Sequence, residues 1–176
     1  MEAIKKISAG MFKAERAVTI VTFIAMMFIM FIQVIFRYVI HASLSWSEES
    51  MRFLFILTGY FGAACCTYEH KHVVIDFLGN IVRHVFKGDE IKQNKTYAVF
   101  DIIVAVVSFG FLGYIAIVMF RYAAGLQAQG AISSAMAMPM CWIGYAVAVA
   151  FACNSIHFFF EIFFSVDKLK RIGRKR

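Results

Sequence analysis

The chain has 176 residues, of which 61% are hydrophobic and 16% are charged, and its formal net charge is +7. Twenty Phe, ten Met, a single Pro and a mean hydropathy of +0.73 exclude an ordinary soluble domain and indicate an integral membrane protein. The basic residues flank apolar runs and do not form one stripe, which argues against a nucleic-acid-binding protein.

Four apolar segments are each long enough to cross a bilayer, which takes about 20 helical residues. In chain order they cover residues 17–40, 46–68, 96–120 and 139–164. The sequence therefore predicts an all-α integral membrane protein, built as a single membrane domain over residues 1–176 with four transmembrane helices.

Charged residues gather where the first two predicted spans meet. Arg37 lies near the end of the first span, on the same helix face as Gln33 at i,i+4. In the second span Arg52 can pair along the helix with Glu48 or Glu49. Because a charge at the bilayer centre costs about 2.5–3.5 kcal/mol, we expect these residues to have a partner or a role.

The start of the second span admits two interpretations. Ser45 and Glu48 fit a capping box, and the short loop brings Arg37 close enough to meet Glu48 or Glu49. Alternatively, Arg37 extends to the lipid headgroups, with Trp46 as an interfacial anchor. For the set as a whole we favour a structured polar cluster or a contact with a partner.

The connection between the second and third spans has its own pattern. Over residues 72–87, apolar side chains fall on one helical face, while polar ones, including His72 and Asp76, fall on the other. This predicts an amphipathic helix lying in the membrane interface. A helix docked onto a partner remains the alternative.

The loops predict the orientation of the chain. Fifteen Lys and Arg residues lie in the N-terminal segment, the 69–95 connection and the C-terminal tail, whereas the other two connections contain only Arg52 and Arg121. Because cytoplasmic loops are enriched in basic residues, both termini are predicted to be cytoplasmic.

A second polar set lies toward the cytoplasmic side. Asn154, His157 and Glu161 are spaced i, i+3, i+7 on the fourth helix, and Asp101 lies in the third. Such residues suit a proton relay, but hydrogen bonding between helices is the simpler explanation. The chain carries no catalytic, cofactor-binding or metal-binding motif, so we expect neither an enzyme nor a bound cofactor or metal.

The motif residues together are similar to a known family. Arg37-Tyr38, then Trp46-x-Glu48-Glu49-x-x-Arg52, Gly62 and His72-x-x-x-Asp76 resemble the DctQ-type small membrane subunit of tripartite ATP-independent periplasmic (TRAP) transporters. The four-span layout extends this resemblance to nearly the whole chain. The Trp-x-Glu-Glu-x-x-Arg core is its most specific part.

The resemblance implies a non-catalytic, multi-pass protein of the bacterial inner membrane. Its implied partners are a large DctM-type membrane subunit, which holds the substrate and sodium sites, and a periplasmic substrate-binding protein that delivers an organic anion such as a sialic acid or a C4-dicarboxylate. Membrane lipid is a further expected partner, and nucleic acid is not. The small subunit is then expected to brace the large one, with the motif residues in structural or interface roles.

Two other classes remain open. The chain could be a small self-sufficient channel or proton-coupled carrier that works as a homo-oligomer through Asp101, His157 and Glu161. It could also be an anchor subunit for electron transfer. Against independent transport, the sequence has no internal repeat, and its only Pro, Pro139, lies at the start of a predicted helix.

Overall fold

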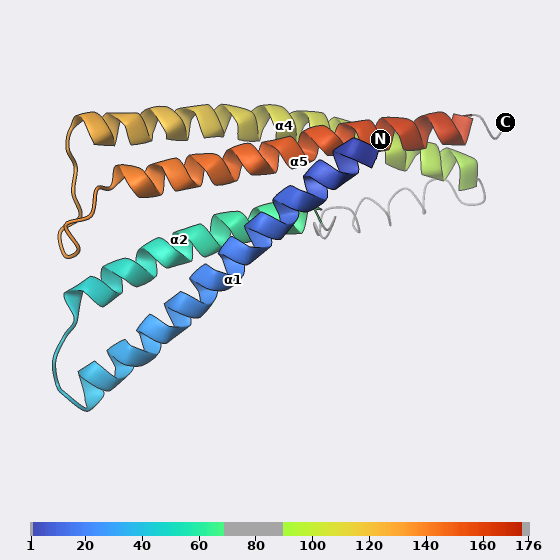
Figure 1. Ribbon diagram of the computed structural model, residues 1–176. Helices are drawn as coiled ribbons and strands as arrows, with labels where there is room; N and C mark the ends of the chain where they lie inside the picture. The colour runs from blue at the N-terminus through green and yellow to red at the C-terminus, as the bar shows by residue number, and fades with distance from the viewer. Residues whose placement is uncertain (1, 69–89, 174–176) are drawn as a thin grey trace.

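The computed structural model describes residues 2–68 and 90–173. In this part of the chain it consists of four long helices, α1 (Glu2–Tyr38), α2 (Ser45–Tyr68), α4 (Glu90–Ala128) and α5 (Cys141–Gly173) (Figure 1). Each contains a stretch that is long and apolar enough to cross a membrane. The predicted all-α membrane fold with four transmembrane helices is therefore confirmed.

Two further predictions are not tested by these helices. The cytoplasmic placement of both termini stays a prediction. The amphipathic helix predicted at 72–87 lies outside the described residues.

Three of the helices, α1, α4 and α5, extend beyond the predicted spans, and α1 does so the most. α1 has 37 residues, or about 55 Å at 1.5 Å per residue, whereas the apolar core of a bilayer is about 30 Å thick. The first predicted span begins at residue 17, but the helix runs without interruption from Glu2. Lys6, Lys13 and Arg16 lie on exposed positions of α1, so these charges end the apolar run without ending the helix.

The helices form two antiparallel pairs, α1 with α2 and α4 with α5, and α2 also packs against α5. In Figure 1 the α1–α2 pair diverges from the α4–α5 pair toward the end that carries the 39–44 and 129–140 loops, which we call the loop end. At the opposite end, the terminal end, the first turns of α1 lie beside the later part of α5.

The α4–α5 pair packs through small residues. Ala98, Ala105 and Ala123 of α4 are fully buried or nearly so. A Cβ atom added to Gly144 of α5 would lie 2.8 Å from the Cβ of Ala123, so only glycine permits this approach of the two backbones. Close packing of small residues is a common way to hold helices together in a membrane, where lipid offers no hydrophobic driving force between them.

The 129–140 loop starts with a defined helix cap. Gly130 has a φ of 62° and follows the last turn of α4. The amide of Ala131 donates to the carbonyl of Leu126, and the amide of Gly130 donates to the carbonyl of Gln127, both at 3.1 Å. This is a Schellman cap, which satisfies carbonyls that the helix end would otherwise leave free. The loop therefore leaves α4 in a fixed direction, toward the start of α2.

Candidate functional site

The charged cluster at the loop end is centred on the first turns of α2. Glu48 reaches α1, where its Oε1 accepts a hydrogen bond of 3.4 Å from the Nε2 of Gln33. Arg37 is exposed one turn further along α1, and the described residues contain no ion pair between it and Glu48 or Glu49. Gln33, and not Arg37, therefore makes the contact to Glu48 across the loop.

The capping box predicted at the start of α2 is not formed. The helix begins at Ser45, one residue before the predicted span, and no hydrogen bond joins Ser45 and Glu48 in the described part of the chain. Instead the Ser47 hydroxyl, which is fully buried, donates to the Leu44 carbonyl at 2.7 Å. Glu48 is turned toward Gln33 and is therefore unavailable for the backbone of its own helix.

Glu49 connects the two helix pairs at the loop end. Its Oε2 accepts hydrogen bonds from the backbone amides of Ala135 and Met136, at 3.0 and 2.9 Å. The adjacent Ser50 hydroxyl donates to the carbonyl of Trp46 and lies 3.1 Å from the sulfur of Met136. The start of α2 is thereby fastened to the loop that links α4 and α5. Local spacing could not indicate this contact, because its partners are 86 and 87 residues apart.

The other residues of the motif are exposed. Trp46 is 42% exposed, and Arg37 and Arg52 are exposed as well. Within the described residues Arg52 forms no ion pair with Glu48 or Glu49. The motif therefore divides into Glu49, which ties α2 to the 129–140 loop, Glu48, which makes one exposed contact to Gln33, and side chains that are exposed without such a contact in the described residues. An interface role for these exposed residues stays a prediction, and His72 and Asp76 lie outside the described residues.

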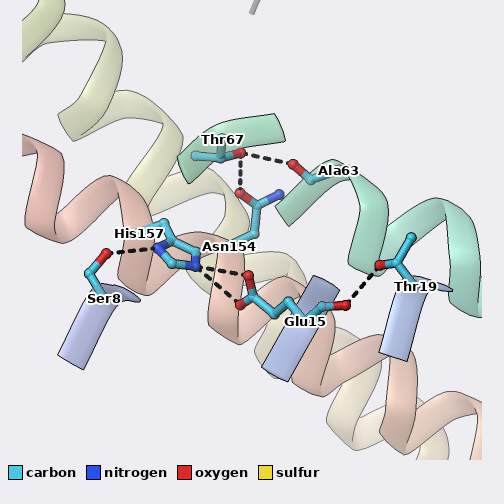
Figure 2. Close-up of polar contacts among 7 residues, drawn as sticks. All are labelled: Ser8, Glu15, Thr19, Ala63, Thr67, Asn154 and His157. Atoms are coloured by element: carbon cyan, nitrogen blue, oxygen red, sulfur yellow. Dashed lines mark hydrogen bonds and ion pairs between the residues drawn. The ribbon is translucent and has the colours of Figure 1, made fainter. Parts of the chain in front are cut away.

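A buried polar cluster lies at the terminal end and joins α1 to α5 (Figure 2). The Nε2 of His157 lies 3.0 and 3.1 Å from the two carboxylate oxygens of Glu15, and its Nδ1 lies 3.4 Å from the hydroxyl of Ser8. Glu15 is 3% exposed and His157 is 4% exposed. An ionised carboxylate only accepts hydrogen bonds, so the proton of the imidazole is placed on Nε2. If the imidazole is neutral, its Nδ1 accepts a hydrogen bond from the Ser8 hydroxyl; if it is charged, its Nδ1–H donates a hydrogen bond to that hydroxyl.

A second buried bond, between α2 and α5, lies beside this pair (Figure 2). The hydroxyl of Thr67 lies 2.7 Å from the Oδ1 of Asn154 and 3.1 Å from the carbonyl of Ala63. Tyr68 presents its ring to His157 in an edge contact with the centroids 5.6 Å apart, and it stacks on Phe12 of α1 at 4.4 Å. Three helices therefore meet around His157.

The sequence identified only part of this cluster. Asn154 and His157 share one face of α5, as their spacing predicts, and both bond to other helices. Glu15 was missed, although it is an acidic residue in a basic segment and stands seven residues after Ser8, on the same helix face. Asp101 is not among the residues bonded to His157, because Glu15 and Ser8 occupy both ring nitrogens.

The two ends of the molecule thus share one architectural feature. Hydrogen bonds connect the α1–α2 pair to the α4–α5 pair at the loop end through Glu49, and at the terminal end through Glu15 and Thr67. Within residues 2–68 and 90–173, no group of three His, Cys, Asp or Glu side chains is placed to hold a metal ion. The arrangement holds four helices in one relative position.

Two comparisons with known proteins agree with this architecture. Residues 26–167 match the family described as tripartite ATP-independent periplasmic transporters, DctQ component. A segment of 60 residues is 40% identical to the sialic acid TRAP transporter permease protein SiaT of Haemophilus influenzae (strain 86-028NP). That segment covers 34% of this chain and 10% of the relative, so the chain corresponds to a small part of that protein.

Proposed function

Since this chain belongs to the DctQ family of TRAP transporter components, we propose that it is the small, non-catalytic scaffold subunit of a sodium-driven importer of an organic acid anion. In this proposal it braces a large DctM-type subunit in the bacterial inner membrane, and a periplasmic binding protein delivers the anion to the complex. A sialic acid is the favoured cargo because the relative SiaT is named for one; a C4-dicarboxylate is the other candidate.

The main support for this proposal is that hydrogen bonds connect the two helix pairs at both ends of the molecule. A transport element that alternates between two states needs parts that move against one another, and many carriers have helices broken at the membrane midplane. Here the hydrogen bonds of Glu49 at one end and of Glu15 at the other oppose such movement. α1, α2, α4 and α5 are each continuous through their apolar stretches.

The lateral surface supports the same proposal. In the most apolar 18-residue stretch of α1 only 6% is buried within the chain, and the same holds for the corresponding stretch of α4. Side chains such as Phe28 and Phe31 on α1, and Phe111 and Val107 on α4, are more than half exposed. A subunit with so much free apolar surface has ample area for a large membrane partner as well as for lipid.

The alternative of an independent carrier working through Asp101, His157 and Glu161 is less well supported. His157 is held on both sides by Glu15 and Ser8, which is the arrangement of a structural contact. Replacing all three residues together would abolish uptake by such a carrier. A scaffold that still assembles would support uptake with the same replacements.

A cross-linking experiment tests the bracing role. In a variant without its native cysteines, Ser50→Cys and Met136→Cys place two thiols across the two helix pairs, where the wild-type side chains are 3.1 Å apart. A short bifunctional reagent then fixes the pairs to each other. A static brace predicts that the assembled transporter takes up its anion at an unchanged rate after cross-linking.

The matched control links two helices of the same pair. Thr22→Cys and Thr58→Cys replace hydroxyls that lie 2.8 Å apart, so this cross-link joins α1 to α2 only. Loss of uptake after the Ser50–Met136 cross-link, with normal uptake after the Thr22–Thr58 cross-link, would show that the two helix pairs must move and would overturn the brace.

A further inference from the structure

One face of α2 is exposed along most of the helix. It consists of residues that recur at intervals of three or four and are all exposed: Glu48, Arg52, Phe55, Gly59 and Ala63. We call these five residues the outer face of α2. The other sides of the helix contact α1 and α5. Within residues 2–68 and 90–173, the outer face is therefore the part of α2 that is left uncovered.

Lipid is a poor cover for the outer face. α2 is the least apolar of the four helices, yet only 17% of its most apolar 18-residue stretch is buried within the chain. The exposed stretches of α1 and α4 are much more apolar, so hydrocarbon can cover them without loss. The helix that suits lipid least is thus still largely exposed, and a protein surface covers it better.

Arg52 is the residue of the outer face that most needs a partner. It lies about 10 Å from the start of α2, whose 24 residues span about 36 Å. The nearby carboxylates are engaged elsewhere. Glu48 accepts a hydrogen bond from Gln33, and Glu49, although within electrostatic reach of Arg52, binds amides of the 129–140 loop. No ion pair to Arg52 forms in the described part of the chain. Since ionisable residues within a span are almost always paired, a carboxylate from another chain is expected here.

The middle of the outer face allows another helix to come close. A Cβ atom added to Gly59 would meet nothing within 4 Å, so packing within the chain does not require glycine there. This differs from Gly144, which Ala123 leaves no room for a side chain. Ala63 is exposed one turn after Gly59. Small residues four positions apart are the pattern that lets the backbones of two membrane helices approach each other.

From the charge and the small residues together, we propose that the outer face of α2 is the docking surface for a transmembrane helix of the large subunit. That helix packs over Gly59 and Ala63, lies beside the ring of Phe55, and carries a carboxylate at the level of Arg52. The partner is the large subunit of the proposed function, on which this assignment rests. Lipid then covers the more apolar exposed faces of α1 and α4.

Photo-cross-linking at matched positions tests which face is covered. Phe55 of α2, Phe28 of α1 and Phe111 of α4 have nearly equal exposure, at 67%, 67% and 62%. Each is replaced in turn by p-benzoylphenylalanine in the full chain, which is co-expressed with a tagged DctM-type subunit, purified as a complex and irradiated. We expect the highest yield of cross-linked large subunit from the position of Phe55. Equal yields from all three positions, or a higher yield from Phe28 or Phe111, would overturn the assignment.

The close approach of the partner helix has its own test. Gly59→Leu places a branched side chain on the outer face, and Gly110→Leu does the same on α4; neither new Cβ meets an atom of the chain within 4 Å. Gly59→Leu should lower the amount of large subunit that co-purifies by about tenfold or more, and Gly110→Leu should leave it unchanged. Circular dichroism confirms that both variants remain helical. A wild-type yield with Gly59→Leu would contradict the packing.

Replacement of Arg52 distinguishes a carboxylate of the large subunit from the phosphate of a lipid. A carboxylate partner predicts that Arg52→Ala lowers co-purification, that Arg52→Lys restores part of it, and that Arg121→Ala on α4 has no effect. A lipid partner predicts that Arg52→Ala instead lowers the phosphatidylglycerol that the isolated chain retains from nanodiscs, with co-purification unchanged. That result would overturn the assignment, and so would the absence of any change, which would show that the guanidinium reaches the headgroups unaided.

Failure of the proposed function gives a different result. If the wild-type chain does not co-purify with the DctM-type subunit, the scaffold role is wrong, and the docking surface is wrong with it. If the two co-purify but Phe55 gives no cross-link, the scaffold role stands and the assignment of the outer face alone is wrong.

Discussion

Removing the carboxylate of Glu15 should loosen the contact between α1 and α5 more than any other single change at the terminal end. Glu15→Ala leaves the Nε2–H of His157 buried without its acceptor, which costs about 1–3 kcal/mol. The lost bond itself contributes about 0.6 kcal/mol on average within membranes and up to about 1.7. We therefore expect Glu15→Ala to lower the free energy of unfolding by about 2–3 kcal/mol.

A double-mutant cycle isolates the pair. The wild type, Glu15→Ala, His157→Ala and the double variant are unfolded by SDS titration in mixed micelles, and the fluorescence of the two Trp residues reports the transition. Each single variant leaves the other side chain buried without its partner. The losses of unfolding free energy in the two single variants, added together, should therefore exceed the loss in the double variant by about 1–2 kcal/mol. Glu48→Ala is the control, since its carboxylate is exposed and makes one long bond to Gln33.

The cycle has a clear refuting result. If the effects of Glu15→Ala and His157→Ala add to within about 0.5 kcal/mol, the two side chains are energetically independent. The buried pair would then not be what holds α1 against α5.

Three further predictions concern the remaining contacts. Gly144→Ala should destabilise the α4–α5 pair by about 1–3 kcal/mol, because the new Cβ would lie 2.8 Å from that of Ala123. The control is Gly125→Ala, whose new Cβ meets open space. Equal midpoints of SDS unfolding for the two variants would refute the close approach of the two helices. Glu49→Ala should speed hydrogen exchange at the backbone amides of Ala135 and Met136 by about tenfold, because these amides lose their acceptor. Mass spectrometry of the 129–140 peptide measures the exchange. An unchanged exchange rate would show that the carboxylate does not hold this loop. Thr58→Val removes the hydroxyl contact between α1 and α2 and should lower the free energy of unfolding in the same SDS titration by about 0.6 kcal/mol. A loss above about 2 kcal/mol would contradict the small contribution expected of a hydroxyl bond between helices in a membrane.

The sequence was sufficient to predict the helical architecture. Apolar runs long enough to cross a bilayer indicate the four helices, since lipid requires every backbone group in the span to be paired within its own segment. It was less informative about helix ends. The exposed charges Lys13 and Arg16 interrupt the apolar run of α1 but leave its backbone hydrogen bonding unaffected, so the helix begins 15 residues before the predicted span, at Glu2 rather than at 17.

The candidate site was predictable only where it depended on spacing within one helix. Asn154 and His157 share a face of α5 because they are three residues apart, and this led to the correct expectation that they bond to other helices. Their partners could not be found in the same way. Glu15 is 142 residues from His157, and no local rule selects one distant carboxylate over another. The same reason explains why Glu49 was assigned to Arg37 or Arg52, whereas it binds a loop 86 residues away.

We propose above that this chain is a scaffold on which a separate large subunit depends. The most direct test is uptake of radiolabelled sialic acid into proteoliposomes under a sodium gradient, with the periplasmic binding protein present. The liposomes contain a DctM-type subunit alone, this chain alone, or both together. If the chain is such a scaffold, uptake occurs only when both are present. Uptake at the full rate by the large subunit alone, or any uptake by this chain alone, would contradict it.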